Sequence, residues 1–206
     1  MIVDKIKLKL QKREAVISVI GLGYVGLPLA LRFSEEGFRV YGHDIDIEKI
    51  KSIKSGASYI SSINKKKVQV AINKNFNVSV DYTNISLADI IVICVPTPLK
   101  RSKEPNLKYI QDTLKSIKPF LKENQTLILE STTYPGTTKE ILLPFANSIV
   151  DSKNRKKILV GTNFFIGYSP EREDPGNLNF ETKDIPRVIS GITKSCVEIM
   201  KSIYSQ

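Results

Sequence analysis

Residues 15–26 read AVISVIGLGYVG, an apolar run followed by three glycines with the spacing GxGxxG. The apolar run, Ala15 to Ile20, is typical of a buried parallel strand. The residues after the glycines, Leu27 to Glu36, favour a helix, and Gly37 supplies a stop signal. A glycine-rich loop between a strand and a helix is the context that a dinucleotide-binding motif requires.

Each glycine of this loop has a separate physical task. Gly21 allows a tight turn, Gly23 lets the backbone approach a pyrophosphate, and Gly26 lets the helix pack close to the strand. The N-terminus of the helix then offers unpaired N–H groups and a partial positive charge to the phosphates. We therefore expect the cofactor to contact the whole loop, which consists of Gly21, Leu22, Gly23, Tyr24, Val25 and Gly26.

An acidic residue follows the second predicted strand, 38–43. This residue, Asp44, stands about 20 residues after the loop, where a ribose-binding acid is expected. Its carboxylate can accept hydrogen bonds from a ribose diol and would repel a 2′-phosphate, which favours NAD over NADP. Asp46, a predicted helix cap, and Lys49 follow closely, and we expect both to contact the cofactor. The ammonium of Lys49 could tolerate an additional phosphate, so NADP stays open.

Strand and helix patterns alternate along the rest of the chain. Such alternation predicts an α/β fold of the Rossmann type, a doubly wound, mainly parallel sheet with helices on both faces. Residues 1–206 are read as one NAD(P)-binding domain with a short basic, amphipathic helix at 2–12, packed on the domain rather than on a membrane surface. The other predicted strands are 77–80, 89–95, 125–129, 164–168 and 187–190, and the other predicted helices are 47–54, 64–73, 107–121, 137–150, which Pro144 breaks or kinks, and 193–204.

The chain is basic, with a net charge of +10. Its lysines are spread widely, and the two densest runs, 65–67 and 153–157, have no interleaved aromatic residues of the kind that stack on bases. The charge is therefore interpreted as a solvated surface rather than a nucleic-acid site, an alternative that a steep salt dependence of binding would support. No apolar run approaches the length that spans a bilayer, so no membrane insertion is expected.

Cysteine and histidine are scarce. Cys94 and Cys196 are too few for a disulfide framework, so reduced thiols and a cytoplasmic location are expected. A single histidine, His43, makes a metal site improbable. Cys94 lies within an apolar strand pattern and is expected to be a buried, unreactive thiol. Cys196 shares a helical face with apolar residues and is expected in the core or at an interface.

Four longer strings occur in order: GLGYVGLP at 21–28, CVPTP at 94–98, ESTTYPGTT at 130–138 and YSPEREDPG at 168–176. Together they resemble the UDP-glucose/GDP-mannose dehydrogenase family over nearly the whole chain. The last string, with FET at 180–182 after it, is most similar to the UDP-N-acetylglucosamine 6-dehydrogenase branch. The resemblance implies oxidation of a sugar C6 alcohol to a carboxylate with two NAD, through a cysteine thioester that water hydrolyses.

The resemblance also implies site residues. Glu171 handles the hydrolytic water, with Thr132 as its hydroxyl partner, and a carboxylate within reach of a water can deprotonate it. A surface or salt-bridged carboxylate remains the alternative for Glu171. Ser131 and Thr132 are expected near the nicotinamide. The cofactor is expected along Val95, Pro96 and Thr97, and the nucleotide sugar along Glu171, Arg172, Glu173 and Asp174.

The family's nucleophilic cysteine, central helix and C-terminal UDP-binding domain are expected beyond residue 206. We therefore predict the N-terminal cofactor-binding half of such an enzyme, which binds NAD but does not turn over UDP-N-acetylglucosamine alone. The homodimer is expected only for the full-length enzyme, through the central helix. Two alternatives stay open: a non-catalytic NAD-binding or regulatory module, and the same half of an enzyme for UDP-glucose, UDP-N-acetylgalactosamine or GDP-mannose.

Overall fold

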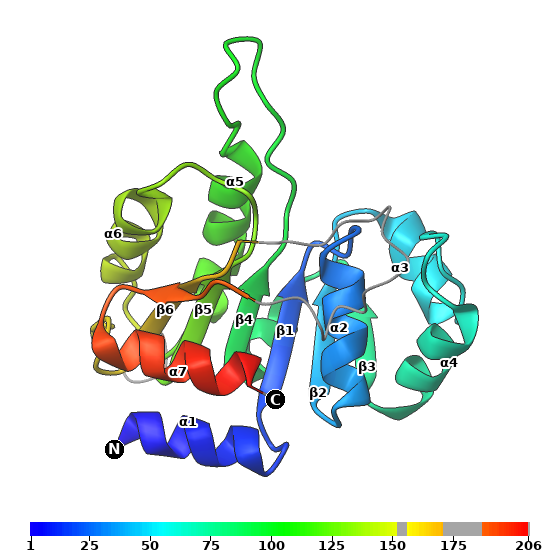
Figure 1. Cartoon of the computed structure of the whole chain (residues 1–206), viewed down its shortest axis with the longest axis horizontal. Coiled ribbons are helices and arrows are strands. Elements are labelled where there is room, and N and C mark those ends of the chain that lie inside the picture. The colour runs from blue at the N-terminus through cyan, green and yellow to red at the C-terminus, as the bar shows by residue number, and fades with distance from the viewer. Residues whose placement is uncertain (152–155, 171–186, 206) are drawn as a thin grey trace.

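A computed structural model describes residues 1–151, 156–170 and 187–205. These residues form one sheet with the strand order β3-β2-β1-β4-β5-β6-β7 (Figure 1). The first six strands are parallel along the sheet, and β7 pairs antiparallel with β6. The strands are β1 Val16–Ile20, β2 Arg39–His43, β3 Phe76–Ser79, β4 Ile90–Ile93, β5 Gln125–Leu129, β6 Phe164–Tyr168 and β7 Ser190–Gly191.

The central strand β4 shows why the sheet needs cover on both faces. All four of its residues are buried, although alternate side chains of a strand point to opposite faces. Ile90 and Val92 belong to one apolar cluster, whereas Ile91 and Ile93 belong to another. A strand that is apolar on both faces is stable only between two layers of helices.

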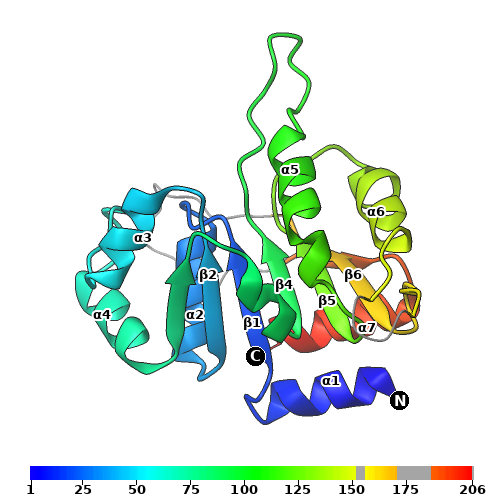
Figure 2. The same ribbon diagram turned by 180° about the vertical axis from the view of Figure 1, so that it is seen from behind.

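Helices supply both layers. Buried apolar side chains of α1, α2, α3, α4 and α7 join the first cluster, and those of α5 and α6 join the second. Figures 1 and 2 show α2 and α7 on one side of the sheet and α5 on the other, so the predicted Rossmann-type, doubly wound fold is confirmed. The helices are α1 Ile2–Gln11, α2 Gly26–Glu35, α3 Ile47–Lys54, α4 Lys65–Lys74, α5 Lys108–Ile117, α6 Leu143–Asn147 and α7 Lys194–Tyr204.

The first helix packs on the domain, as expected. Ile6 and Leu10 of α1 are buried in the first cluster, next to α7. Lys7 pairs with Glu198 of α7 at 2.7 Å, and Lys9 pairs with Asp89 at 2.6 Å. No helix in the described ranges combines the length and apolarity that a membrane span needs.

Three sequence predictions are corrected by the structure. The helix predicted at 137–150 is a π-helical segment, Thr138–Leu142, followed by the short α6. The change from π to α geometry falls at Leu143, directly before Pro144, so the irregularity predicted at Pro144 is present within a shorter helical stretch. The helix predicted at 107–121 ends at Ile117 and continues as a 3-10 turn, and the strand predicted at 187–190 is only the two-residue β7.

Candidate functional site

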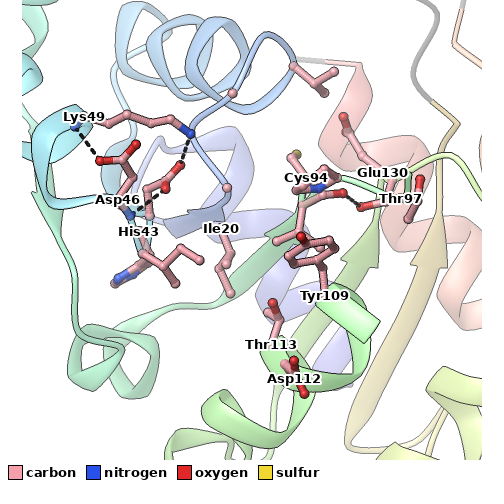
Figure 3. Close-up of a pocket in the computed structure, with 18 of the residues that line it drawn as sticks. Ile20, His43, Asp46, Lys49, Cys94, Thr97, Tyr109, Asp112, Thr113 and Glu130 are labelled. Atoms are coloured by element: carbon pink, nitrogen blue, oxygen red, sulfur yellow. Dashed lines mark hydrogen bonds and ion pairs between the residues drawn. The ribbon is translucent and has the colours of Figure 1, made fainter. Parts of the chain in front are cut away.

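A cavity of about 740 Å³ lies at the carboxyl ends of β1, β2, β4 and β5. The chain passes from β1 to β2 on one side and returns to β4 on the other, so this edge is the topological switch point of the sheet. Ligands of open α/β sheets bind in the crevice at such a point. Figure 3 shows Asp46 and Lys49 on one side of the cavity and Thr97 and Glu130 on the other.

The glycine loop forms the first wall of the cavity. Gly21 has a φ of +89°, and an added Cβ would lie 2.8 Å from the carbonyl oxygen of Cys94. An added Cβ on Gly26 would lie 1.9 Å from the carbonyl oxygen of Gly21, whereas one on Gly23 would meet no atom within 4 Å. The loop is therefore crowded against protein at its ends and open in its middle, which fits the approach of a pyrophosphate.

Helix α2 begins at the end of this loop. Its N-cap, Val25, has no side chain that caps the first turn. The first N–H groups of a helix have no partner within the helix and carry partial positive charge. Because Gly23, Tyr24 and Val25 line the cavity, this end of α2 suits an anionic group.

Asp44 is fixed at the wall of the cavity, and only 7% of its surface is exposed. Its Oδ2 accepts the N–H of Leu22 at 2.9 Å and the ammonium of Lys49 at 3.2 Å. Its Oδ1 accepts the N–H of Asp46 at 3.0 Å. The ion pair places a cation beside the position predicted for the ribose, as the sequence analysis anticipated for Lys49.

Asp46 caps the following helix. Its Oδ1 accepts the N–H of Glu48 at 2.9 Å and that of Lys49 at 3.4 Å, so the predicted N-cap is confirmed. Asp46 also lines the cavity together with Asp44 and Lys49. Its role in cofactor binding stays a prediction.

Two loops after β4 and β5 form the opposite wall. The hydroxyl of Ser131 donates to the carbonyl oxygen of Val95 at 2.6 Å, and that of Thr97 donates to the carbonyl oxygen of Thr132 at 2.5 Å. These reciprocal bonds tie the two loops to each other. The structure thus brings the predicted residues Val95, Pro96, Thr97, Ser131 and Thr132 into the same cavity as the glycine loop.

The position of Cys94 differs from the sequence prediction. The residue follows the last residue of β4, Ile93, rather than lying inside the strand, and it lines the cavity. Its side chain is buried, as expected, with 9% of its surface exposed. Cys196 is fully packed in the first cluster with Ile199, which confirms the core assignment.

Sequence reasoning assigned no role to Glu130, which is completely buried and lines the cavity. Its Oε1 accepts the phenol proton of Tyr204, in the last turn of α7, and pairs with Arg187 at 3.1 Å. Burial and the nearby Glu130 carboxylate raise the pKa of Tyr204, so the phenol keeps its proton and donates. The signal in the sequence was a carboxylate directly after a predicted strand, but its partners lie far away along the chain.

His43 lies at the carboxyl end of β2, and no role was predicted for it or for the polar residues around it. Burial lowers the pKa of His43, whose Nδ1 lies 2.7 Å from the carbonyl oxygen of Asp81 and whose Nε2 lies 3.3 Å from the Ser18 hydroxyl. Hydrogen bonds from Ser79 and Thr83 lower the pKa of Asp81 to about 2. His43 lines the cavity with Tyr82 and with four residues of α5: Tyr109, Asp112, Thr113 and Ser116.

Four predicted residues, Glu171, Arg172, Glu173 and Asp174, lie outside the described residues. Among the residues that are described, no group of three or more histidine, cysteine or carboxylate side chains is placed to hold a metal ion.

A family model described as UDP-glucose/GDP-mannose dehydrogenase family, NAD binding domain, matches residues 15–206. This chain belongs to that family. The family model describes an NAD-binding domain, so NAD is the cofactor of this chain.

Curated relatives agree with this assignment. The chain is 32% identical to Protein CapL of Staphylococcus aureus over 189 residues, which are 92% of this chain and 42% of that protein. It is 36% identical to a UDP-N-acetyl-D-mannosamine dehydrogenase of Methanococcus aeolicus, over 100% of this chain and 44% of the relative. It is 30% identical to a UDP-N-acetyl-D-glucosamine 6-dehydrogenase of Pseudomonas aeruginosa, over 94% and 44% respectively.

Solved structures show the same partial match. The UDP-N-acetyl-mannosamine dehydrogenase Cap5O of S. aureus superposes with a TM-score of 0.81 at 28% identity, covering 93% of this chain and 44% of that one. The GDP-mannose dehydrogenase of P. aeruginosa gives a TM-score of 0.76 at 28% identity, covering 92% and 44%. The chain therefore spans less than half the length of each of these five relatives.

Proposed function

We propose that this chain is the cofactor-binding half of an NAD-dependent nucleotide-sugar 6-dehydrogenase. The observation that carries the proposal is the family match over residues 15–206, in a chain that spans 44% of a dehydrogenase such as that of M. aeolicus. The cavity supports the proposal because it lies at the switch point and has an open glycine loop, a fixed carboxylate and two tied loops.

In the proposed complex, NAD lies across the carboxyl edge of the sheet. The open backbone at Gly23 and the N-terminus of α2 hold the pyrophosphate, and Asp44 holds the adenosine ribose. Ser131 and Thr132 border the nicotinamide. When bound, NAD supplies the hydride acceptor for oxidation of the sugar.

The water-handling role of Glu171, with Thr132 as its partner, belongs to the same proposal. A carboxylate beside the reacting carbon can orient and deprotonate a water. The proposal is supported by the string around Glu171 and by the place of Thr132 in the cavity. The backbone of 172–174 then borders the nucleotide sugar.

UDP-N-acetylglucosamine is the proposed nucleotide sugar, supported by the string at 168–176 and by the relative from P. aeruginosa. UDP-N-acetylmannosamine is a second candidate, because the M. aeolicus relative that bears this name is 36% identical over the whole chain. Both candidates are UDP-linked N-acetylhexosamines. The cytoplasm is the proposed location, which suits two cysteines, Cys94 and Cys196, that form no disulfide in the described residues.

We expect the polypeptide to bind NAD without sustained oxidation of the sugar, since both of its cysteines are buried. Calorimetry with NAD and NADP measures binding, and NADH absorbance with either UDP-N-acetylhexosamine measures turnover. Binding of NAD in preference to NADP without turnover is the expected result. Equal affinity for NAD and NADP would contradict the role of Asp44, and steady NADH production would contradict the half-enzyme proposal.

The competing hypothesis is that the chain is a non-catalytic NAD-binding or regulatory module. Coexpression with the remaining half of a relative such as the M. aeolicus enzyme separates the two. NADH production by the reconstituted pair supports the half-enzyme, and its absence from a pair that does associate supports the module. A homodimer is expected only when both halves are present.

A further inference from the structure

The peptide group between Leu22 and Gly23 is held by a side chain from another part of the chain. Tyr59, in the connection between α3 and α4, donates a hydrogen bond from its phenol to the carbonyl oxygen of Leu22. Burial and the carboxylates of Asp44 and Asp46 raise the pKa of Tyr59. The phenol therefore keeps its proton and remains a donor at neutral pH.

The position of Tyr59 is fixed by its own connection. The hydroxyl of Ser58 accepts the N–H of Ile60 at 3.1 Å and donates to the carbonyl oxygen of Ile60 at 3.0 Å, and Ile60 is buried. On the other side, the ammonium of Lys49 lies 5.9 Å from the centroid of the Tyr59 ring and pairs with Asp44. The ring is thus held between the core and this ion pair.

Peptide geometry links this contact to the cavity. The carbonyl and the N–H of a trans peptide point in opposite directions, and the described chain has no cis peptide bond. A Leu22 carbonyl directed at Tyr59 therefore turns the N–H of Gly23 to the other side. Gly23 lines the cavity, and within the described residues no protein acceptor takes its N–H.

We propose that Tyr59 is a positioning residue for NAD, which aims the Gly23 N–H at the pyrophosphate by holding the Leu22 carbonyl. This inference rests on the proposed role of the chain in NAD binding. The bond to the carbonyl also polarises the peptide and so strengthens its N–H as a donor. An anionic phosphate oxygen gains most from such a donor, because the resulting hydrogen bond is charge-assisted.

The test is calorimetry of the whole chain with NAD, ADP-ribose and adenosine. Tyr59→Phe removes the phenol and keeps the ring beside Lys49. We expect Kd to rise about tenfold for NAD and for ADP-ribose, which carry the pyrophosphate, and to stay unchanged for adenosine. The matched control is Tyr41→Phe, since Tyr41 is also half-buried but, within the described residues, its phenol makes no hydrogen bond to the glycine loop.

The amide signal of Gly23 gives a second readout by NMR. Addition of NAD should move this signal less in Tyr59→Phe than in the wild type or in Tyr41→Phe. If the wild type binds no NAD, the proposed function fails and takes this inference with it. If the wild type binds NAD and Tyr59→Phe binds it equally well, or loses adenosine to the same extent, only the role of Tyr59 is overturned.

Discussion

The two walls of the cavity hold their shape by different means. The glycine-loop wall, residues 21–26, is shaped by close backbone approaches, such as the 1.9 Å that would separate a Cβ on Gly26 from the carbonyl oxygen of Gly21. The β5 wall, residues 130–132, is shaped by side chains from distant segments, including Tyr204 of α7 and Thr97. The glycine-loop wall requires residues that have no Cβ atom. The β5 wall requires hydrogen bonds from segments that are distant along the chain.

This difference predicts how substitutions in each wall affect stability and NAD binding. Substitution in the glycine-loop wall should act locally, through a steric clash or through loss of access for NAD. Substitution in the β5 wall should instead loosen a segment far away along the chain. Three predictions test that contrast, and a fourth concerns the titration of His43, which lines the same cavity.

The largest effect is expected for Glu130→Ala, which removes a completely buried carboxylate together with its ion pair to Arg187 and its hydrogen bond from Tyr204. Removal of one partner from a buried ion pair destabilises a protein by about 3–5 kcal/mol. Urea denaturation measures this change, and hydrogen exchange should show faster opening of α7. The control is Glu198→Ala on the same helix, whose exposed pair with Lys7 should be worth about 0.5 kcal/mol. If both variants lose the same free energy of unfolding, the β5 wall does not depend on α7.

Gly26→Ala should have the next largest effect on stability. Its methyl group would collide with the Gly21 carbonyl, and overpacking of this kind costs about 1–3 kcal/mol. Gly23→Ala should leave stability nearly unchanged, because its methyl group meets no protein atom, yet it should weaken NAD binding by occupying the open side of the loop. Thermal unfolding and calorimetry separate the two effects. The interpretation fails if Gly23→Ala loses as much stability as Gly26→Ala.

Ser131→Ala should lower the free energy of unfolding by about 1 kcal/mol, since it removes the bond at 2.6 Å to the carbonyl oxygen of Val95. It should also weaken NAD binding, because it releases the loop after β4. The matched control is Ser86→Ala, whose hydroxyl donates to the carbonyl oxygen of Thr83, three residues away in the same short segment. Unchanged NAD affinity in Ser131→Ala would show that the two loops hold the cofactor independently.

The smallest effect concerns pH. Burial lowers the pKa of His43 below its ordinary value of 6.5, so the unfolded chain binds a proton that the folded chain resists. Stability should therefore be constant above pH 6.5 from this group and should fall as the pH drops below it. His43 is the single histidine, and the groups facing it are Ser18, Asp81 and Tyr82. The urea midpoint of the wild type should therefore fall between about pH 7 and pH 5, and this pH dependence should disappear in His43→Gln. If the dependence persists in His43→Gln, another titrating group causes it.

The fold and the glycine-loop wall could be predicted because their causes are local. Glycine spacing, an apolar run and the position of Asp44 are all visible within residues 15–44. The predicted N-cap, Asp46, was found for the same reason, since its acceptor serves N–H groups two and three residues away. The boundaries that failed, at 137–150 and 187–190, lie where tertiary packing overrides helix or strand preference.

The rest of the site could not be predicted from local pattern. The strings after β4 and β5 indicated Val95 to Thr97 and Ser131 to Thr132 only through the family resemblance. Glu130 and Tyr59 were missed because their partners, Tyr204 and Leu22, lie 74 and 37 residues away in sequence. No propensity or periodicity encodes such pairs, which exist only after the sheet has ordered the chain.

The two edge strands of the sheet, β3 and β7, affect how readily copies of the chain associate. A strand at the edge of a sheet exposes unpaired N–H and C=O groups that another chain can extend, and a short edge strand limits this risk. Here β3 has four residues at one edge, and at the other edge the two-residue β7 pairs with Gly167 and Tyr168 of β6. Short edge strands offer little template for strand addition between copies, so concentrated samples should resist fibril-like aggregation.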